Sequence, residues 1–326
     1  MHRPYRRFAE ELAQFLPVYT DSPYDRAGED YVAYADGDPK QLFCFNSLHA
    51  YADKCVWTHL DAQLRALKAQ GRTSVRILDA GCGPGTWLRR VIAHAHWLGF
   101  TEIVARGFDI SEVQIAAAEK KSRAVARLAG VRLDFDVANL TTRLPEADKS
   151  VDLTLCLYSV LSHLPPAAMP GVIAEFARVT CGHFITTVRA IGSTPTIYVD
   201  AVEKARTFRQ DHAHDRFTVE FTNGGRMEMN SHLFSADELR NLVGAHFAIE
   251  DLAGLDIFHG RFAPDSRWNP ASLAVDAALE AQLSRLEETY AHDSHLIDRA
   301  NHLLLLARGL TKRPEGPYSP IREIRG

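Results

Sequence analysis

The stretch VRILDAGCGPGTW, residues 75–87, joins an apolar run to an acid and three glycines at alternate positions. The run 75–82 predicts a buried strand, and the residues from Thr86 onward predict a helix. Glycine between a strand and a helix permits a sharp turn and leaves backbone N–H groups at the helix N-terminus, which suits the polar part of a nucleotide-like ligand. We therefore expect a ligand site at Gly81, Gly83 and Gly85, at the carboxyl edge of a sheet.

Strands and helices alternate after this turn. The apolar runs that predict the next strands lie at 103–110, 131–138, 151–161 and 183–190. Ser111 and Ser235 are the expected N-caps of two of the helices. This alternation predicts a parallel sheet with right-handed crossovers and helices on both faces, an α/β fold.

The pattern changes outside this region. After residue 190 we expect a helix over 198–211 and a hairpin over 217–234 that turns at Asn223-Gly224-Gly225. The remaining expected elements are helices over 3–16, 46–70 and 271–297 and strands over 247–258 and 301–309. The predicted organisation is a helical N-terminal cap over 1–72, a main domain over 73–310 with an α+β insertion at 191–234, and a tail over 311–326.

Composition limits the class of protein. The chain has 326 residues and a formal net charge of -4, which argues against nucleic acid as the main partner. Its five cysteines are scattered without a C-x-x-C pair, which favours reduced thiols in the cytoplasm. No apolar stretch approaches the roughly 18 residues of a membrane span. We expect a cytoplasmic monomer or homodimer with no membrane partner.

Three acids lie at the ends of the first three predicted strands: Asp79, Asp109 and Asp136. At this edge Asp109 could accept hydrogen bonds from ribose hydroxyls, Asp136 from an adenine amino group, and Asp79 from a ligand ammonium. Each could instead be a helix cap or turn residue. A nicotinamide dinucleotide site is disfavoured, because Thr86 stands where the third glycine of G-x-G-x-x-G would be.

With these motifs the sequence resembles the class I S-adenosylmethionine-dependent methyltransferases. The resemblance rests on VRILDAGCGPGTW, GFDIS, DFDVANL and SVDLTLCLYSVLSHL, and it covers 75–190 and the final strands. It implies a Rossmann-like seven-stranded sheet of order 3-2-1-4-5-7-6 whose last strand is antiparallel. It also implies S-adenosylmethionine as cofactor and S-adenosylhomocysteine as product. The cofactor contacts that it implies are Asp79, Gly81, Gly83, Gly85, Asp109, Ile110, Asp136, Val137 and, near the sulfonium, Leu157.

Four further residues are candidates for catalysis or for closing the pocket. His163 is the best candidate for a general base, although it could equally pack against a helix start. Tyr158 is a second candidate, for the pocket wall. Tyr31 and Tyr34 could fold over the cofactor and place their rings near the positive sulfur, or they could merely pack. No spacing of histidines and acids predicts a metal site.

The expected function is methyl transfer to an N or O atom of a small metabolite or natural-product acceptor. One alternative is an enzyme that attacks the aminocarboxypropyl arm of the cofactor, as azetidine-2-carboxylate synthases do, and releases methylthioadenosine. Another alternative is a cofactor-binding subunit that activates a partner without catalysis. The intact glycine loop and ribose acid argue against this last class.

Overall fold

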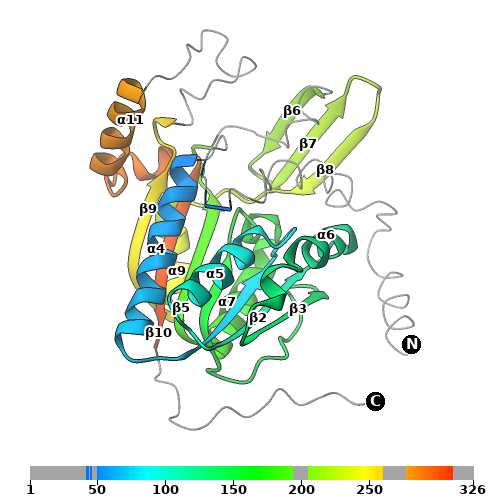
Figure 1. The fold of residues 1–326 in the computed structure, drawn as a ribbon. Coiled ribbons are helices and arrows are strands. Elements are labelled where there is room, and N and C mark those ends of the chain that lie inside the picture. The colour runs from blue at the N-terminus through cyan, green and yellow to red at the C-terminus, as the bar shows by residue number, and fades with distance from the viewer. Residues whose placement is uncertain (1–41, 44, 46–49, 194–204, 260–276, 311–326) are drawn as a thin grey trace, which may run out of the picture.

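A computed structural model describes residues 42–43, 45, 50–193, 205–259 and 277–310. Its main sheet has the strand order β3-β2-β1-β4-β5-β10-β9, with β10 antiparallel to both β5 and β9 (Figure 1). The strands are β1 Ser74–Ala80, β2 Glu102–Asp109, β3 Val131–Val137, β4 Val151–Cys156, β5 Thr180–Arg189, β9 Phe247–Leu255 and β10 His302–Gly309. The predicted seven-stranded order and its antiparallel last strand are confirmed.

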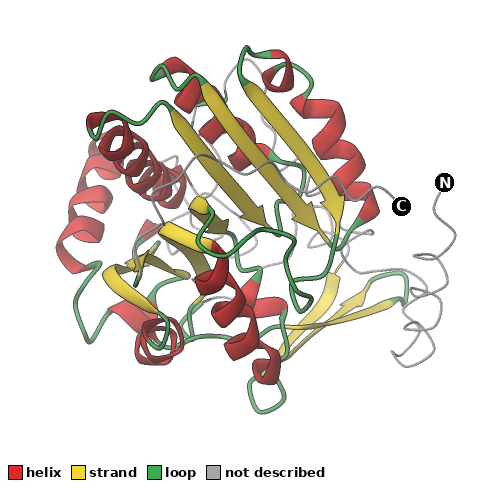
Figure 2. Ribbon diagram, turned by 90° about the horizontal axis from the view of Figure 1, so that it is seen from below, coloured by secondary structure: helices red, strands yellow, loops and turns green. Residues whose placement is uncertain are grey.

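Helices cover both faces of this sheet (Figure 2). One face carries α4 Ala50–Ala69, α5 Thr86–Trp97 and α6 Glu112–Ser122, and the other carries α7 Met169–Val179 and α9 Ala236–Gly244. Strand β1 shows why consecutive residues are apolar: Ile77 packs into the core beside α4 and α5, and Leu78 packs into the core beside α7 and α9. A strand covered on both faces has no solvent side that would favour polar residues.

The remaining short elements lie in the connections. A 14-residue helix, α11 Ala277–Tyr290, lies between β9 and β10. The 3-10 turns are η2 Val125–Arg127, η3 Leu161–His163, η4 Pro166–Ala168 and η5 Ile297–Arg299. None of the described helices is both long and apolar enough to cross a membrane.

Both predicted serine caps are confirmed. The Ser111 hydroxyl accepts a hydrogen bond from the backbone N–H of Gln114 at 3.2 Å, at the start of α6. The Ser235 hydroxyl accepts one from the N–H of Glu238 at 3.1 Å, at the start of α9. Each hydroxyl satisfies an N–H that has no partner inside its helix, so these two boundaries were readable from local sequence.

A separate three-stranded antiparallel sheet is formed by β6 Ala205–Asp211, β7 Arg216–Phe221 and β8 Arg226–Asn230 (Figure 1). The predicted hairpin is confirmed as β7 and β8, with Gly224 in the left-handed region at φ 83°. The helix predicted over 198–211 is wrong where the chain is described, because residues 205–211 are a strand paired with β7. Phe208 stacks on Phe217 at 6.2 Å, so cross-strand packing overrides the helical pattern.

The ends of two other elements differ from the sequence-based expectations. Strand β4 ends at Cys156, not near residue 161, because the chain turns out of the sheet at Tyr158 and Ser159, with φ of 54° and 70°. Residues 291–297 lie beyond the end of α11, so the helix expected over 271–297 is shorter at its C-terminal end. The helix predicted over 3–16 lies outside the described residues.

Candidate functional site

The glycine loop between β1 and α5 has the conformation that its composition predicts. Gly81, Gly83 and Gly85 have φ values of 74°, 50° and 74°, all in the region that side-chain-bearing residues rarely adopt. A Cβ atom on Gly81 would lie 2.5 Å from Cγ2 of Val160, in the connection after β4. Backbone conformation and close packing therefore both require glycine at that position.

The amides of this loop are bound within the protein. The N–H groups of Gly81 and Cys82 donate to the carbonyl oxygen of Phe108, at 2.8 and 2.9 Å. The N–H of Gly83 donates to Oδ2 of Asp109 at 3.0 Å. These three N–H groups therefore have partners inside the protein. They fix the loop against the end of β2.

Asp109 is fixed in place by the same arrangement. One carboxylate oxygen accepts from Gly83, and the other accepts from the N–H of Ser111 at 3.0 Å. The carboxylate is only partly buried. Because a carboxylate oxygen can accept more than one hydrogen bond, Asp109 can still accept from a ligand diol at this edge.

Asp79 lies deeper in the fold than Asp109. It is 2% exposed, and its burial together with the nearby charge of Asp109 raises its pKa to about 7, although a backbone hydrogen bond from Leu88 acts in the opposite direction. The neutral and charged forms are therefore both accessible near neutral pH. A cation close to Asp79 would favour the charged form.

The ends of β2 and β3 expose apolar surface beside an acid. Ile110 is 53% exposed and Val137 is 51% exposed, and the strand register pairs Asp109 with Val137. The carboxylate of Asp136 lies next to them and forms an ion pair with Arg106, Oδ2 to Nη1, at 3.1 Å. Two apolar side chains and a hydrogen-bond acceptor suit a flat base that carries an amino group. These residues therefore fit the adenosyl part of the cofactor.

Tyr158 and Leu157 lie at the end of β4. The Leu157 side chain is buried in the core, so only its backbone is available near a ligand. The left-handed conformation of Tyr158 is supported by a 2.6 Å hydrogen bond from its N–H to the hydroxyl of Thr187. Its ring stacks on Trp87 with centroids 5.8 Å apart, and its hydroxyl donates to Asp53 of α4. Strained backbone at the end of a central strand is typical of functional sites.

His163 contacts the three-stranded sheet. Its Nδ1 lies 3.0 Å from the carbonyl oxygen of Asn230 in β8. A carbonyl oxygen only accepts, so Nδ1 carries the proton, and in the neutral ring Nε2 is the basic nitrogen. Burial is the main cause that lowers the pKa of this histidine. The geometry is compatible with a general base and with a packing role.

Two predicted site residues fall in a part of the chain that the structure does not describe, and two further residues were not predicted. Tyr31 and Tyr34 lie outside the described residues. Sequence reasoning missed Asp53 and Arg106, each a charged residue on an apolar background. Asp53 is 8% exposed on the buried face of α4, and Arg106 interrupts the apolar strand β2. That interruption of an apolar pattern was the signal that could have identified them.

Comparison with known proteins adds a family match. A family model described as a methyltransferase domain matches residues 77–183. No curated protein matches the chain.

Several solved structures are similar to this chain at low sequence identity. A SAM-dependent methyltransferase of Methanosarcina mazei is 17% identical, with a TM-score of 0.47, over 74% of this chain and 95% of its own. Magnesium protoporphyrin IX methyltransferase of Synechocystis PCC 6803, with bound SAM, is 15% identical, with a TM-score of 0.46, over 87% and 92%. The PH0226 protein of Pyrococcus horikoshii OT3 is 16% identical, with a TM-score of 0.45, over 78% and 91%.

The matched residues extend from β1 into β5 and include the glycine loop, Asp109 and Asp136. The sheet order is that of the Rossmann-like methyltransferase fold. Residues 77–183 are therefore similar in sequence to a methyltransferase domain, and the sheet that they help to form has the strand order of that fold.

Proposed function

We propose that this protein is an enzyme that transfers the methyl group of S-adenosylmethionine to an N or O atom of a small metabolite or natural-product acceptor. When bound, S-adenosylmethionine supplies an activated methyl group on a good leaving group. The protein then has mainly to align the acceptor with that methyl group, which can contribute roughly 7–11 kcal/mol to lowering the barrier.

The observation that carries this proposal is that two elements, α4 and the three-stranded sheet, contact the segment after β4. From one side α4 contacts it through the hydrogen bond between Asp53 and Tyr158. From another side the inserted sheet contacts it through the hydrogen bond between His163 and Asn230. An acceptor that must reach the end of β4 between these two elements is more easily a small molecule than a nucleic acid. The formal net charge of -4 also disfavours a polyanion.

We assign the residues as follows. Asp79, the three loop glycines, Asp109, Ile110, Asp136, Val137 and the backbone at Leu157 form the cofactor side. Tyr158 forms the acceptor wall, with Tyr31 and Tyr34 from the N-terminal cap closing over the site. His163 removes the acceptor proton, since a neutral imidazole with a lowered pKa is a competent base near neutral pH.

Product chromatography tests the reaction class. Purified protein is incubated with S-adenosylmethionine and a panel of amine, phenol and carboxylate acceptors. The proposal predicts S-adenosylhomocysteine in amounts equal to the methylated acceptor. Methylthioadenosine would instead indicate attack on the aminocarboxypropyl arm, and cofactor binding with no turnover on any acceptor would favour a non-catalytic partner subunit.

The catalytic assignment has its own test. His163→Gln can retain a donor near the Asn230 carbonyl but lacks a base, so we expect kcat to fall roughly 10²–10⁴-fold with little change in cofactor affinity. An unchanged kcat in a folded His163→Gln protein would assign His163 to packing alone.

A further inference from the structure

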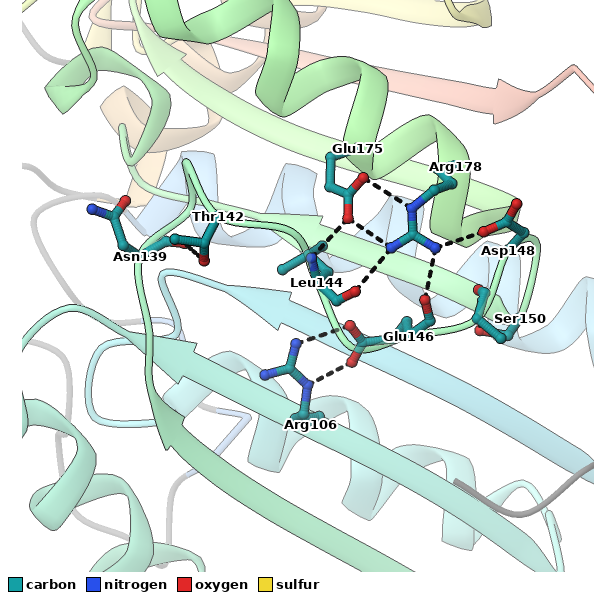
Figure 3. A network of polar contacts seen from close by, with 10 residues as sticks. Arg106, Asn139, Thr142, Leu144, Glu146, Asp148, Ser150, Glu175 and Arg178 are labelled. Atoms are coloured by element: carbon teal, nitrogen blue, oxygen red, sulfur yellow. Dashed lines mark hydrogen bonds and ion pairs between the residues drawn. The ribbon is translucent and has the colours of Figure 1, made fainter. Parts of the chain in front are cut away.

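Arg106 is a charged side chain in the middle of β2, and its surroundings are specific. Only 13% of the side chain is exposed, and its guanidinium lies 4.9 Å from the centroid of the Phe108 ring. It donates two hydrogen bonds to the carboxylate of Glu146, at 2.5 and 2.9 Å (Figure 3). A third, from Nη1 to Oδ2 of Asp136, measures 3.1 Å. The guanidinium therefore bridges two carboxylates.

Glu146 is itself held in place by α7. Arg178 donates to the backbone carbonyl oxygens of Glu146 and Leu144, at 2.8 and 2.9 Å, and to the carboxylate of Asp148 at 2.7 Å (Figure 3). Glu175 pairs with the same guanidinium and accepts the N–H of Leu144 at 2.7 Å. The connection between β3 and β4 is thereby anchored, which gives Arg106 a fixed partner.

The orientation of the Asp136 carboxylate depends on Arg106, whereas that of the Asp109 carboxylate does not. Asp109 is held by two backbone amides, whereas the Asp136 side chain is 53% exposed. Within the described part of the chain, its only hydrogen bond is the one from Arg106, through Oδ2. A half-exposed aspartate without such a bond would sample several rotamers.

We propose that Arg106 is a positioning residue for adenine recognition. It holds one oxygen of Asp136 so that the other accepts a hydrogen bond from the exocyclic amino group of the base. The inference rests on the proposed cofactor site and adds to it the residue that orients the adenine acid. The planar fork of arginine suits this role, since it can bond both carboxylates at once, and its charge offsets the repulsion between Asp136 and Glu146.

The test uses calorimetric titration with two ligands. One is S-adenosylhomocysteine, and the other is its purine analogue, in which hydrogen replaces the 6-amino group. In the wild type we expect the analogue to bind more weakly. Arg106→Met should weaken binding of S-adenosylhomocysteine roughly 3- to 10-fold, which is typical of losing one hydrogen bond, and should change the affinity for the analogue by less than about 2-fold. A loss of general packing would weaken both ligands equally.

A matched control is available on the same two strands. Arg132 pairs with Glu102 across β2 and β3 at 2.5 Å, but at the opposite ends of the strands. Arg132→Met should leave both affinities unchanged. If circular dichroism shows that Arg106→Met is unfolded, Glu146→Gln replaces it, with an expected loss of roughly 2- to 4-fold for S-adenosylhomocysteine only.

The outcomes separate the inference from the proposed function. Equal weakening of both ligands by the Arg106 or Glu146 substitution, or weakening of neither, would overturn the positioning role. Binding of neither ligand by folded wild-type protein would overturn the proposed cofactor site itself.

Discussion

The buried carboxyl group of Asp79 gives a prediction about stability that can be worked out from the structure. Its pKa is about 7, chiefly because burial disfavours the charged form and secondarily because of the charge on Asp109. In an unfolded chain an aspartate has a pKa of about 3.9. Between about pH 4 and 7 the folded state therefore holds a proton that the unfolded state has lost. The contribution of this group to stability must fall as pH rises through that window.

The size of this effect follows from the two pKa values. The difference between about 7 and about 3.9 corresponds to about 4 kcal/mol. Roughly 2–3 kcal/mol of it falls between pH 5 and pH 8. Solvent screens this group little, because Asp79 is 2% exposed.

The perturbation is Asp79→Asn, which keeps the shape of the side chain and cannot ionise. Urea unfolding of the ligand-free protein, followed by tryptophan fluorescence at pH 5 to 8, gives the free energy of unfolding for both proteins. The substitution can shift the whole curve by a constant, so the readout is the change with pH. Wild type should lose roughly 2–3 kcal/mol more than the variant between pH 5 and 8. Parallel curves for the two proteins would refute the assignment of a raised pKa to Asp79.

Three more outcomes are expected. Gly81→Ala should destabilise the protein by roughly 1–3 kcal/mol, because φ is 74° and the new methyl group would contact Val160. Thermal unfolding measures this loss, and an unchanged melting temperature would contradict it. Asp109→Asn should weaken S-adenosylhomocysteine binding at least about 10-fold, because the side-chain NH2 group of asparagine cannot accept a hydrogen bond where one carboxylate oxygen now accepts from Gly83 or Ser111. Equal affinities of the two proteins by calorimetry would argue against a ribose-binding role. Asp251→Asn should reduce the loss of stability in acid. Hydrogen bonds from His59 and His292 are leading causes that lower the pKa of Asp251 to about 2, so its stabilisation is present above about pH 4 and is lost as pH falls toward 2. Identical acid unfolding of wild type and Asp251→Asn would show that this carboxylate contributes nothing.

The sequence by itself determined the order of strands and helices around the glycine loop. The signals are local: an apolar run long enough to cross a buried sheet, glycines at positions that need φ above zero, and serines three residues before the amides they cap. Gly81, Gly85, Ser111 and Ser235 all behave as their neighbours in sequence predict. The same local reading placed Asp109 and Asp136 at the carboxyl edge of the sheet, since parallel strands end together.

Tertiary structure alone decided where β4 ends, whether residues 205–211 are strand or helix, and which groups hold the site together. The hydrogen bonds from Arg106 to Asp136, from His163 to Asn230 and from Tyr158 to Asp53 join residues 30, 67 and 105 positions apart in sequence. No local periodicity encodes such pairs, because they exist only after distant segments have packed. Edge pairing with β7 likewise converts residues 205–211 into a strand, since the partner supplies hydrogen bonds and apolar contacts that local propensity does not anticipate.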